Sequence, residues 1–274
     1  MAGMVGDPSA GTALLDLDGV VWIGDEPIPR AGAAVARLHA QGWRVGFFTN
    51  NSYPRRAVHL DKLRRFGVPA DDADLLTSAD AAARLCRGAA RVLVLGGPGL
   101  LEALAAEGVE AQAITDDLEP TGPRAPDADV VVVGADPHCT YRRLAVAAGA
   151  LRRGARFVAT NTDATFPAPG GLVPGAGALV AAVRVASGTE PLVAGKPEEP
   201  SAALAREQLG RVAVVVGDRP ATDGLLARRL GARFGLVLSG VTPQGHGGLE
   251  VDADLEADDL AELVEALVAP GAPL

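Results

Sequence analysis

The segment TALLDLDGVV, residues 12–21, combines a short apolar run with two carboxylates and a glycine. The run at 12–15 predicts a buried β-strand, and Asp16 and Asp18 follow it where the chain must turn. Open α/β sheets bind ligands in the crevice at the carboxyl ends of their strands. Two carboxylates so close together repel each other, and usually need a divalent cation, a proton or both. The segment therefore predicts a chemical site at the end of the first strand.

Further polar groups occupy similar positions after other predicted strands. They are Thr49, Asn50 and Asn51 after strand 44–48, Lys196 in a Gly-Lys-Pro turn, and Asp218 after strand 212–216. Together with the first pair, they offer a hydroxyl, an ammonium group and a third carboxylate. Phosphoryl transfer depends on positioning and on neutralising the charge of the transferred group. This set predicts a magnesium-assisted phosphoryl-transfer site.

The residue types suggest a role for each member of the set. Asp16 is the candidate nucleophile, which would form an aspartyl phosphate. Asp18 would protonate the leaving oxygen and then deprotonate the water that hydrolyses the phosphoenzyme. We expect Mg²⁺ to be held by Asp16, the backbone carbonyl of Asp18, Asp218 and waters. Thr49 and Lys196 would hold the phosphoryl group, and Asn50 and Asn51 would lie near the substrate.

Each of these residues also has a purely structural explanation when it is taken alone. An Asp-x-Asp-Gly sequence can form an ordinary turn, and Thr49 and Asp218 can cap helices. Lys196 can be a surface lysine before a turn proline, and Asp223 can cap a helix or brace the loop behind Asp218. The joint occurrence of the motifs favours a single site over four independent structural explanations.

Composition limits the classes of function. The chain has 274 residues, 48% of them hydrophobic, and a formal net charge of −9. This charge argues against nucleic acid or an anionic membrane surface as the main partner. The two cysteines, Cys86 and Cys139, have no metal-ligand spacing, which favours a reducing compartment. Residues 1–11 lack the features of a secretion signal, and no run is long enough to cross a bilayer, so we expect a cytoplasmic protein.

Strand and helix patterns alternate along the whole chain, which predicts an α/β fold with a parallel sheet. The polar motifs fall in the first and last blocks, and the middle block carries none of them. This distribution is typical of one domain inserted into another. We expect a Rossmann-like core formed by residues 1–80 and 188–274, and an inserted α/β domain at 81–187. The pattern also predicts a Gly/Pro-rich loop at 167–175 and a helix at 221–230.

Four stretches together resemble a known family. The sequences LLDLDGVVWIGDEPIP, FFTNNS, AGKP and VVVGDRPATD resemble, in this order, the four signature motifs of haloacid dehalogenase-superfamily phosphatases. The similarity is greatest to the p-nitrophenylphosphatase, phosphoglycolate and glycerol-phosphate phosphatase branch. FVATNTDATFP and GGLVPGAGALVAAV look like the large α/β cap of that branch.

The resemblance implies the same roles that the residue types suggest. Asp16 would be the nucleophile and Asp18 the acid/base, Thr49 and Lys196 would contact the phosphoryl group, and Asp16, Asp18 and Asp218 would surround the magnesium. It also implies a cap that closes over the site and often mediates dimers, with Asn161 and Asp163 as candidate cap contacts. The substrate would be a small phosphorylated metabolite. Glycerol 3-phosphate is our first choice, and 2-phosphoglycolate, pyridoxal phosphate and nitrophenyl phosphate are alternatives.

Two positions depart from the pattern of the family. Pro220 and Ala221 replace a leucine and a commonly acidic or polar residue in the loop that carries Asp218 and Asp223, which would stiffen the loop and weaken the support of the metal ligands. Arg30 stands where the family usually has glycine.

Two rival functions belong to other classes. A receiver-type signalling module also uses clustered aspartates, a hydroxyl and a lysine before proline, but it has no use for a second aspartate beside the nucleophile. A protein that only binds a phosphorylated ligand is the other rival. The intact pair of Asp16 and Asp18 argues against it, whereas the altered loop after Asp218 leaves it open.

Overall fold

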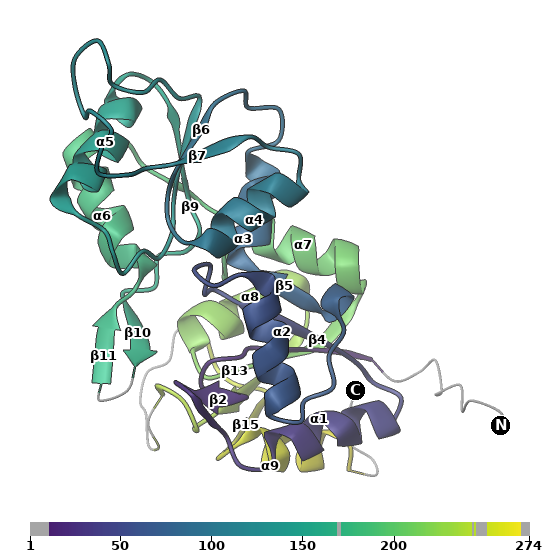
Figure 1. Ribbon diagram of the computed structural model, residues 1–274. Helices are drawn as coiled ribbons and strands as arrows, with labels where there is room; N and C mark the ends of the chain where they lie inside the picture. Colours follow the sequence, from purple (N-terminus) through teal and green to yellow (C-terminus); the bar gives the residue numbers. More distant parts are fainter. Residues whose placement is uncertain (1–10, 169–170, 243, 245–250, 270–274) are drawn as a thin grey trace. The chain divides into compact units, whose positions relative to one another are not determined.

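The computed structural model describes residues 11–168, 171–242, 244 and 251–269, and the chain divides into two compact units. The first unit contains Met1–Thr49, His59–Leu76 and Ser201–Leu274, and the second contains Asn50–Val58 and Thr77–Pro200. Each unit is built around its own sheet (Figure 1). Residues 1–10, which gave most of the basis for expecting no secretion signal, lie outside the described residues.

The first unit holds a six-stranded sheet in the order β15-β14-β13-β1-β4-β5. Its strands are β1 (Thr12–Leu15), β4 (Arg44–Thr49), β5 (Leu75–Thr77), β13 (Val212–Gly217), β14 (Arg233–Val237) and β15 (Leu255–Ala257). Strand β1 pairs in parallel with both β13 and β4, and Leu15 lies opposite Val216 on one side and Phe47 on the other. The chain thus leaves β1 toward one neighbour and returns to the other much later, which creates a switch point at the carboxyl end of β1.

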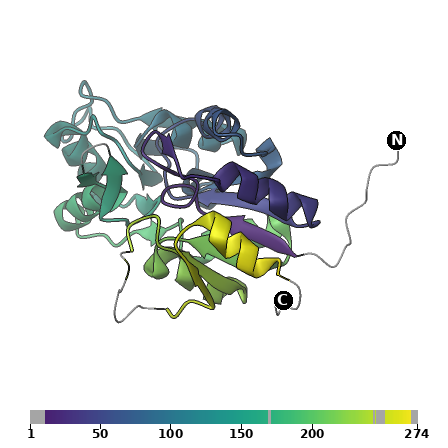
Figure 2. The ribbon, with the colours of Figure 1, turned by 90° about the horizontal axis from the view of Figure 1, so that it is seen from below.

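Helices cover this sheet because its strands are apolar on both faces. One buried cluster joins alternate residues of β1, β4 and β13 to α1 (Ala31–Ala40), α9 (Leu260–Leu267) and the part of α2 (Arg56–Arg65) that carries Leu60 and Leu63. Helices α1 and α9 lie side by side (Figure 2). The remaining elements near this sheet are the hairpin β2 (Trp22–Ile23) and β3 (Glu26–Pro27), η1 (Asp72–Asp74), α7 (Glu199–Leu209), η2 (Pro220–Gly224) and α8 (Leu225–Leu230).

Arg30, which replaces a glycine of the resembled family, adopts a left-handed conformation immediately before α1. Its φ is 65° and its ψ is 1°, and it is the one non-glycine residue with positive φ among those the structure describes. Glycine adopts this conformation without steric cost, whereas a side chain makes it unfavourable. The Arg30 guanidinium compensates in part by donating to Asp259 Oδ2 at 3.1 Å. The arginine therefore holds the chain in a strained conformation that a glycine at this position would adopt without cost.

Replacing Arg30 by glycine is expected to raise the free energy of unfolding of the first unit by about 1 kcal/mol. The lost ion pair is half exposed and subtracts only a few tenths of this gain, on the order of 0.5 kcal/mol at most. Arg30→Ala is the matched variant, because it loses the ion pair but keeps the strain. Chemical unfolding would measure both variants. Equal midpoints for the glycine and alanine variants would contradict the explanation.

The second unit holds a five-stranded parallel sheet in the order β12-β9-β8-β6-β7. The strands are β6 (Val92–Leu95), β7 (Ala111–Ala113), β8 (Val130–Val133), β9 (Arg156–Ala159) and β12 (Leu192–Val193). The helices are α3 (Ser78–Leu85), α4 (Pro98–Ala106), α5 (Tyr141–Arg152) and α6 (Ala176–Ser187). Helices α5 and α6 pack together over the cluster that contains Val131 and Val133. The expected α/β fold with parallel sheets is confirmed.

Two local expectations were wrong. Within the loop expected at 167–175, the structure has most of an antiparallel hairpin formed by β10 (Thr165–Ala168) and β11 (Gly171–Pro174) (Figure 1). Its glycine and proline content resembles a loop, but Pro167 pairs with Leu172 all the same. The helix expected at 221–230 is divided, because the π-helical turn η2 precedes the short helix α8.

The glycine-rich turn at 96–99 is a close approach of backbone segments within the second unit. A Cβ atom at Gly99 would lie 2.0 Å from the carbonyl oxygen of Pro54, so only glycine fits there. The Gly99 amide donates to the carbonyl oxygen of Tyr53 at 2.9 Å. These contacts explain why a glycine stands at this position.

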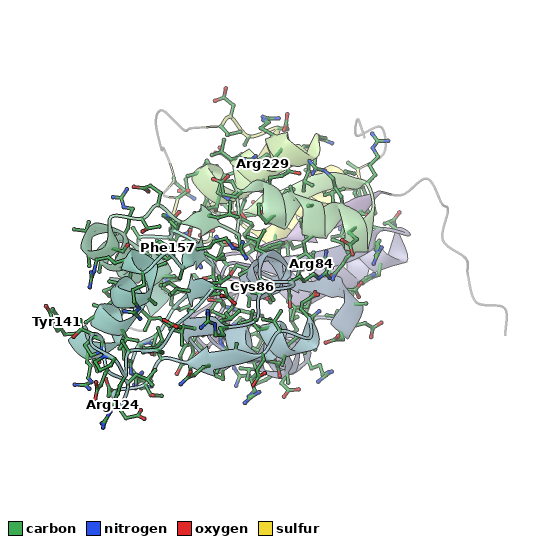
Figure 3. All side chains as sticks on the ribbon, turned by 90° about the horizontal axis from the view of Figure 1, so that it is seen from above. Arg84, Cys86, Arg124, Tyr141, Phe157 and Arg229 are labelled. Atoms are coloured by element: carbon green, nitrogen blue, oxygen red, sulfur yellow. The ribbon has the colours of Figure 1, made fainter. Side chains whose placement is uncertain are left out.

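The described part of the chain contains no helix that is both long enough and apolar enough to cross a membrane. Both cysteines are free thiols. Cys86 is buried in the second unit, whereas Tyr141 and Arg124 lie at its exposed margin (Figure 3). Burial raises the pKa of the Cys86 thiol to about 11.

Candidate active site

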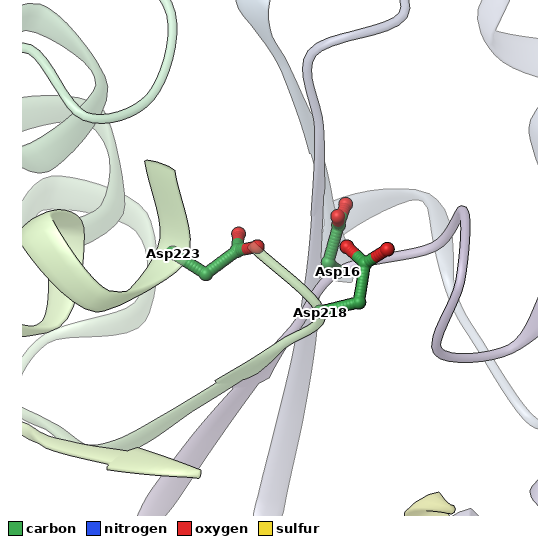
Figure 4. Close-up of side chains that lie close together, drawn as sticks. All are labelled: Asp16, Asp218 and Asp223. Carbon is green, nitrogen blue, oxygen red and sulfur yellow. The ribbon is translucent and has the colours of Figure 1, made fainter. Parts of the chain in front are cut away.

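The carboxyl ends of β1 and β13 bring together three of the aspartates. One carboxylate oxygen each from Asp16, Asp218 and Asp223 lies within 4.8 Å of the others (Figure 4). Asp16 follows β1 directly, and its amide donates to the Val216 carbonyl oxygen at 2.9 Å, which continues the ladder between the two strands. The register of the parallel strands therefore aligns the two loops that carry the acids.

The loop at 239–242 holds Asp218 in place. The amide of Val241 donates to Asp218 Oδ2 at 2.8 Å, and Thr242 Oγ1 donates to the Asp218 carbonyl oxygen at 2.5 Å. A Cβ atom at Gly240 would lie 1.9 Å from Asp218 Oδ2, so the carboxylate occupies the space that a side chain there would need. Asp218 is almost fully buried, with 1% of its surface exposed.

Asp223 reaches the cluster from the π-helical turn Pro220–Gly224. Its Oδ2 accepts hydrogen bonds from the Arg219 amide at 3.3 Å and from Thr222 Oγ1 at 3.4 Å. Pro220 begins the turn, where its fixed φ suits a helical start and its missing N–H costs nothing. With these unusual residues in the loop, Asp223 still lies beside Asp218 and contributes an oxygen to the group itself. The sequence predicted only that Asp223 would cap a helix or brace the loop.

Asp18 lies in the tight turn that follows β1. Three successive amides, those of Val20, Val21 and Trp22, donate to the Leu17 carbonyl oxygen at 3.3, 2.9 and 3.2 Å. The Trp22 indole Nε1 donates to Asp18 Oδ1 at 2.9 Å. The side chain of Asp18 is outside the group of oxygens formed by Asp16, Asp218 and Asp223. A role for its backbone carbonyl as a metal ligand stays a prediction.

Thr49 is the last residue of β4 and is buried, with 1% of its surface exposed. Because β4 and β1 are parallel neighbours, Thr49 at the end of β4 and Asp16 just after β1 lie at the same edge of the sheet. The first unit therefore gathers Asp16, Asp18, Thr49, Asp218 and Asp223 at one edge.

The second unit gathers the other candidate residues around Asn50. The Asn50 side chain accepts from the Lys196 amide at 2.9 Å and donates to the Lys196 carbonyl oxygen at 3.1 Å. It also donates to Asp163 Oδ2 at 3.0 Å, and its own carbonyl oxygen accepts from Asn161 Nδ2 at 2.7 Å. Asn50, Asn161 and Lys196 are all buried. Asn51 is used locally, since its Oδ1 accepts from the Tyr53 amide at 3.2 Å.

Sequence reasoning missed two residues next to Asp18. Trp22 contacts its carboxylate, and Lys62 lies over the Trp22 ring with Nζ 4.4 Å from the ring centroid. Burial lowers the pKa of Lys62, and attraction to Asp18 and Asp25 opposes that change. Lys62 is one of only two lysines in a chain that otherwise uses arginine, and this rarity is the signal that would have drawn attention to it.

Comparisons with known proteins point to one family. A model described as haloacid dehalogenase-like hydrolase matches residues 13–110, and a model described as HAD-hydrolase-like matches residues 193–263. The glycerol-3-phosphate phosphatase of Homo sapiens is 34% identical over 290 residues, which cover 93% of this chain and 90% of the relative.

Solved structures agree with the sequence matches. The p-nitrophenyl phosphatase from Archaeoglobus fulgidus has a TM-score of 0.82 and 32% identity, covering 95% of this chain and 100% of that one. The glycerol phosphate phosphatase from Mycobacterium tuberculosis, in complex with magnesium, has a TM-score of 0.80 and 34% identity, covering 93% of this chain and 76% of that one. These similarities extend over nearly the whole of this chain.

Proposed function

Because the chain belongs to the haloacid dehalogenase-like hydrolases, we propose that it is a magnesium-dependent phosphatase that acts on a small phosphomonoester through an aspartyl-phosphate intermediate. The observation that carries this proposal is the group of Asp16, Asp218 and Asp223 at the ends of adjacent parallel strands. Buried carboxylates gathered so closely repel each other unless a cation or a proton lies among them. Aspartates that served only as turn or helix-cap residues would not need to lie this close together.

The acids of this group suit magnesium. All three offer hard oxygen ligands, which Mg²⁺ prefers, and it commonly takes one or two carboxylates together with waters and substrate phosphate. Asp16, Asp218 and the backbone carbonyl of Asp18 would hold the ion, with Asp223 completing or bracing the set. When bound, the ion neutralises charge on the transferred phosphoryl group.

The chain's own residues would divide the chemistry. Asp16 attacks phosphorus in line, and Asp18 protonates the oxygen that leaves. Asp18 then takes a proton from the water that hydrolyses the phosphoenzyme. The Thr49 hydroxyl and the Lys196 ammonium group hold the phosphoryl oxygens.

The hydrogen bonds around Asn50 support a positioning role for it and for its neighbours. Both ends of the Asn50 amide contact the backbone of Lys196, and Asn161 contacts the backbone of Asn50. These contacts would orient Lys196 toward a phosphoryl group. Asp163, which accepts from Asn50, is the candidate for contact with the organic part of the substrate, together with Asn51.

Glycerol 3-phosphate is the proposed substrate. The relatives from Homo sapiens and Mycobacterium tuberculosis carry glycerol phosphate in their names, and these support the choice. The name of the Archaeoglobus fulgidus phosphatase supports p-nitrophenyl phosphate as a second substrate. Two further candidate substrates, 2-phosphoglycolate and pyridoxal phosphate, rest on the sequence resemblance alone.

We also propose the domain organisation, the assembly and the compartment. The second unit would act as an inserted α/β cap between the core segments of the first unit, and its sheet extends beyond the expected boundary at residue 187, because β12 (Leu192–Val193) pairs with β9. The cap would pair two copies of the chain in a homodimer. Two free thiols and the acidic composition support a cytoplasmic location without nucleic acid or membrane as partner.

Phosphate release tests the activity. The purified protein should release phosphate from glycerol 3-phosphate with Mg²⁺ and lose this activity in EDTA. The same assay with p-nitrophenyl phosphate, 2-phosphoglycolate and pyridoxal phosphate ranks the substrates by kcat/KM. A folded protein that releases phosphate from none of these esters would contradict the proposal and favour a binding or phospho-relay role.

A further inference from the structure

We propose that Trp22 positions the carboxyl group of Asp18 so that its acidic proton is held on Oδ2, and that Lys62 fixes the Trp22 ring for this purpose. This inference rests on the proposed function, because it concerns how the acid/base of that reaction is oriented. Trp22 and Lys62 are positioning residues, since both act through Asp18.

The hydrogen-bonding capacity of indole carries the first step. The Trp22 Nε1–H donates to Asp18 Oδ1 at 2.9 Å, and an indole nitrogen can donate but never accept. A protonated carboxyl group has one oxygen that carries the hydrogen and one carbonyl oxygen that is the better acceptor. Because Oδ1 is committed to accepting from Trp22, the proton is held on Oδ2. The indole donor therefore selects the oxygen from which the acid gives its proton.

The Trp22 ring has little freedom to move away. Only 1% of its surface is exposed. Its backbone accepts from the Gly19 amide at 2.7 Å and pairs with Pro27 in the β2–β3 hairpin. One side of the ring meets Phe66 edge to face, with centroids 6.0 Å apart and planes at 61°. The donor to Asp18 is thus set by both backbone and packing.

Lys62 secures the ring from α2. Its Nζ lies 4.4 Å from the Trp22 ring centroid, donates to the Gly24 carbonyl oxygen, and is 3.7 Å from Asp25 Oδ1. A compact ammonium group with three donors fits these three partners, whereas the planar fork of arginine would not. A cation over the indole face also draws electron density from the ring, which strengthens Nε1–H as a donor.

The proposed orientation affects one step of the reaction more than the others. Asp18 Oδ2–H gives its proton to the leaving oxygen as the phosphorus–oxygen bond breaks, and the bonding pair stays on that oxygen while Asp16 bonds to phosphorus. In the second step, water gives a proton to Oδ2, its oxygen bonds to phosphorus, and the Asp16–phosphorus bond breaks. An alkoxide needs the proton in the first step, whereas nitrophenolate is stable enough to leave without it.

The ratio of kcat/KM for glycerol 3-phosphate to that for p-nitrophenyl phosphate is therefore the readout, because kcat/KM reports the step in which the leaving group departs. Trp22→Phe keeps a buried ring but removes the donor. We expect it to lower this ratio by about tenfold or more, a part of what general acid catalysis contributes. Lys62→Met, which keeps the apolar stem, should lower the ratio by a smaller factor. Asp18→Asn should lower it most.

Trp43→Phe is the matched control, since it removes the other tryptophan of the chain, a buried residue of the same unit. It should leave the ratio unchanged. A variant that had merely lost stability would show the same loss of kcat/KM on both esters. An unchanged ratio in Trp22→Phe, with or without such a loss, would therefore overturn the inference. No activity of the wild-type protein on any ester would instead overturn the proposed function. An unchanged ratio in Asp18→Asn would remove Asp18 as the acid.

Discussion

Replacing Asp16 by asparagine is expected to reduce phosphate release by a factor on the order of 10⁴ or more, while the protein stays folded. The amide is nearly the same size as the carboxylate, and its oxygen can still accept from the Leu17 amide, as Asp16 Oδ1 does at 2.8 Å. The amide oxygen is, however, too weak a nucleophile to attack phosphorus. Nucleophiles that form covalent intermediates show losses of this size when they are removed.

Steady-state release on each ester and circular dichroism would measure the activity and the fold of Asp16→Asn. Rapid acid quenching with labelled substrate adds a direct test, since the wild-type protein should retain label on the chain and the variant should not. Asp252→Asn is a suitable control, because it changes an exposed aspartate of the same unit. Substantial turnover by Asp16→Asn would exclude this residue as the nucleophile.

The second large effect concerns the metal. Asp218→Asn is expected to raise the Mg²⁺ concentration for half-maximal activity by at least about 100-fold, because it removes a charged oxygen ligand from the group around Asp16. Asp223→Asn should raise it by about 10- to 100-fold, the range that supporting residues of metal sites show. The difference between the two variants separates a ligand from a residue that braces the loop.

The thermal midpoint of unfolding tests the same prediction without measuring turnover. A ligand that binds only the folded protein raises its thermal midpoint, so added Mg²⁺ should stabilise the wild-type protein. This increase should be lost in Asp218→Asn. In EDTA, the same variant should be no less stable than the wild type, because one of three mutually repelling carboxylates has been removed. An undiminished response of Asp218→Asn to Mg²⁺ would show that this carboxylate does not bind the ion.

The central strands and the acids at their ends could be predicted from sequence. The runs that became β1 and β13 are almost wholly apolar, as strands buried on both faces must be, and Asp16 and Asp218 follow them directly. Alignment of parallel strand ends then brings the acids together. Asp223 was expected only to brace the loop, and its place among the grouped carboxylate oxygens could not be predicted, because it depends on the π-helical turn that replaces the expected regular helix.

Contacts between residues far apart in the sequence also could not be predicted. The hydrogen bonds between Asn50 and Lys196 join positions far apart in the chain, and no local pattern reveals them. The ring of Trp22 under Lys62 is a further case. The β10–β11 hairpin was not predicted for a different reason, since its glycines and prolines are the residues that normally indicate loops.

The position of β1 has a consequence for synthesis on the ribosome. This strand is made before the other described strands, yet one of its two neighbours, β13, lies beyond the entire main segment of the second unit. The nascent chain must therefore carry β1 with one edge unpaired while residues 77–200 are made and begin to fold. Domains generally fold as units during synthesis, so the inserted segment can mature before the sheet that carries Asp16 is closed. The active site is thus one of the last parts of the molecule to form.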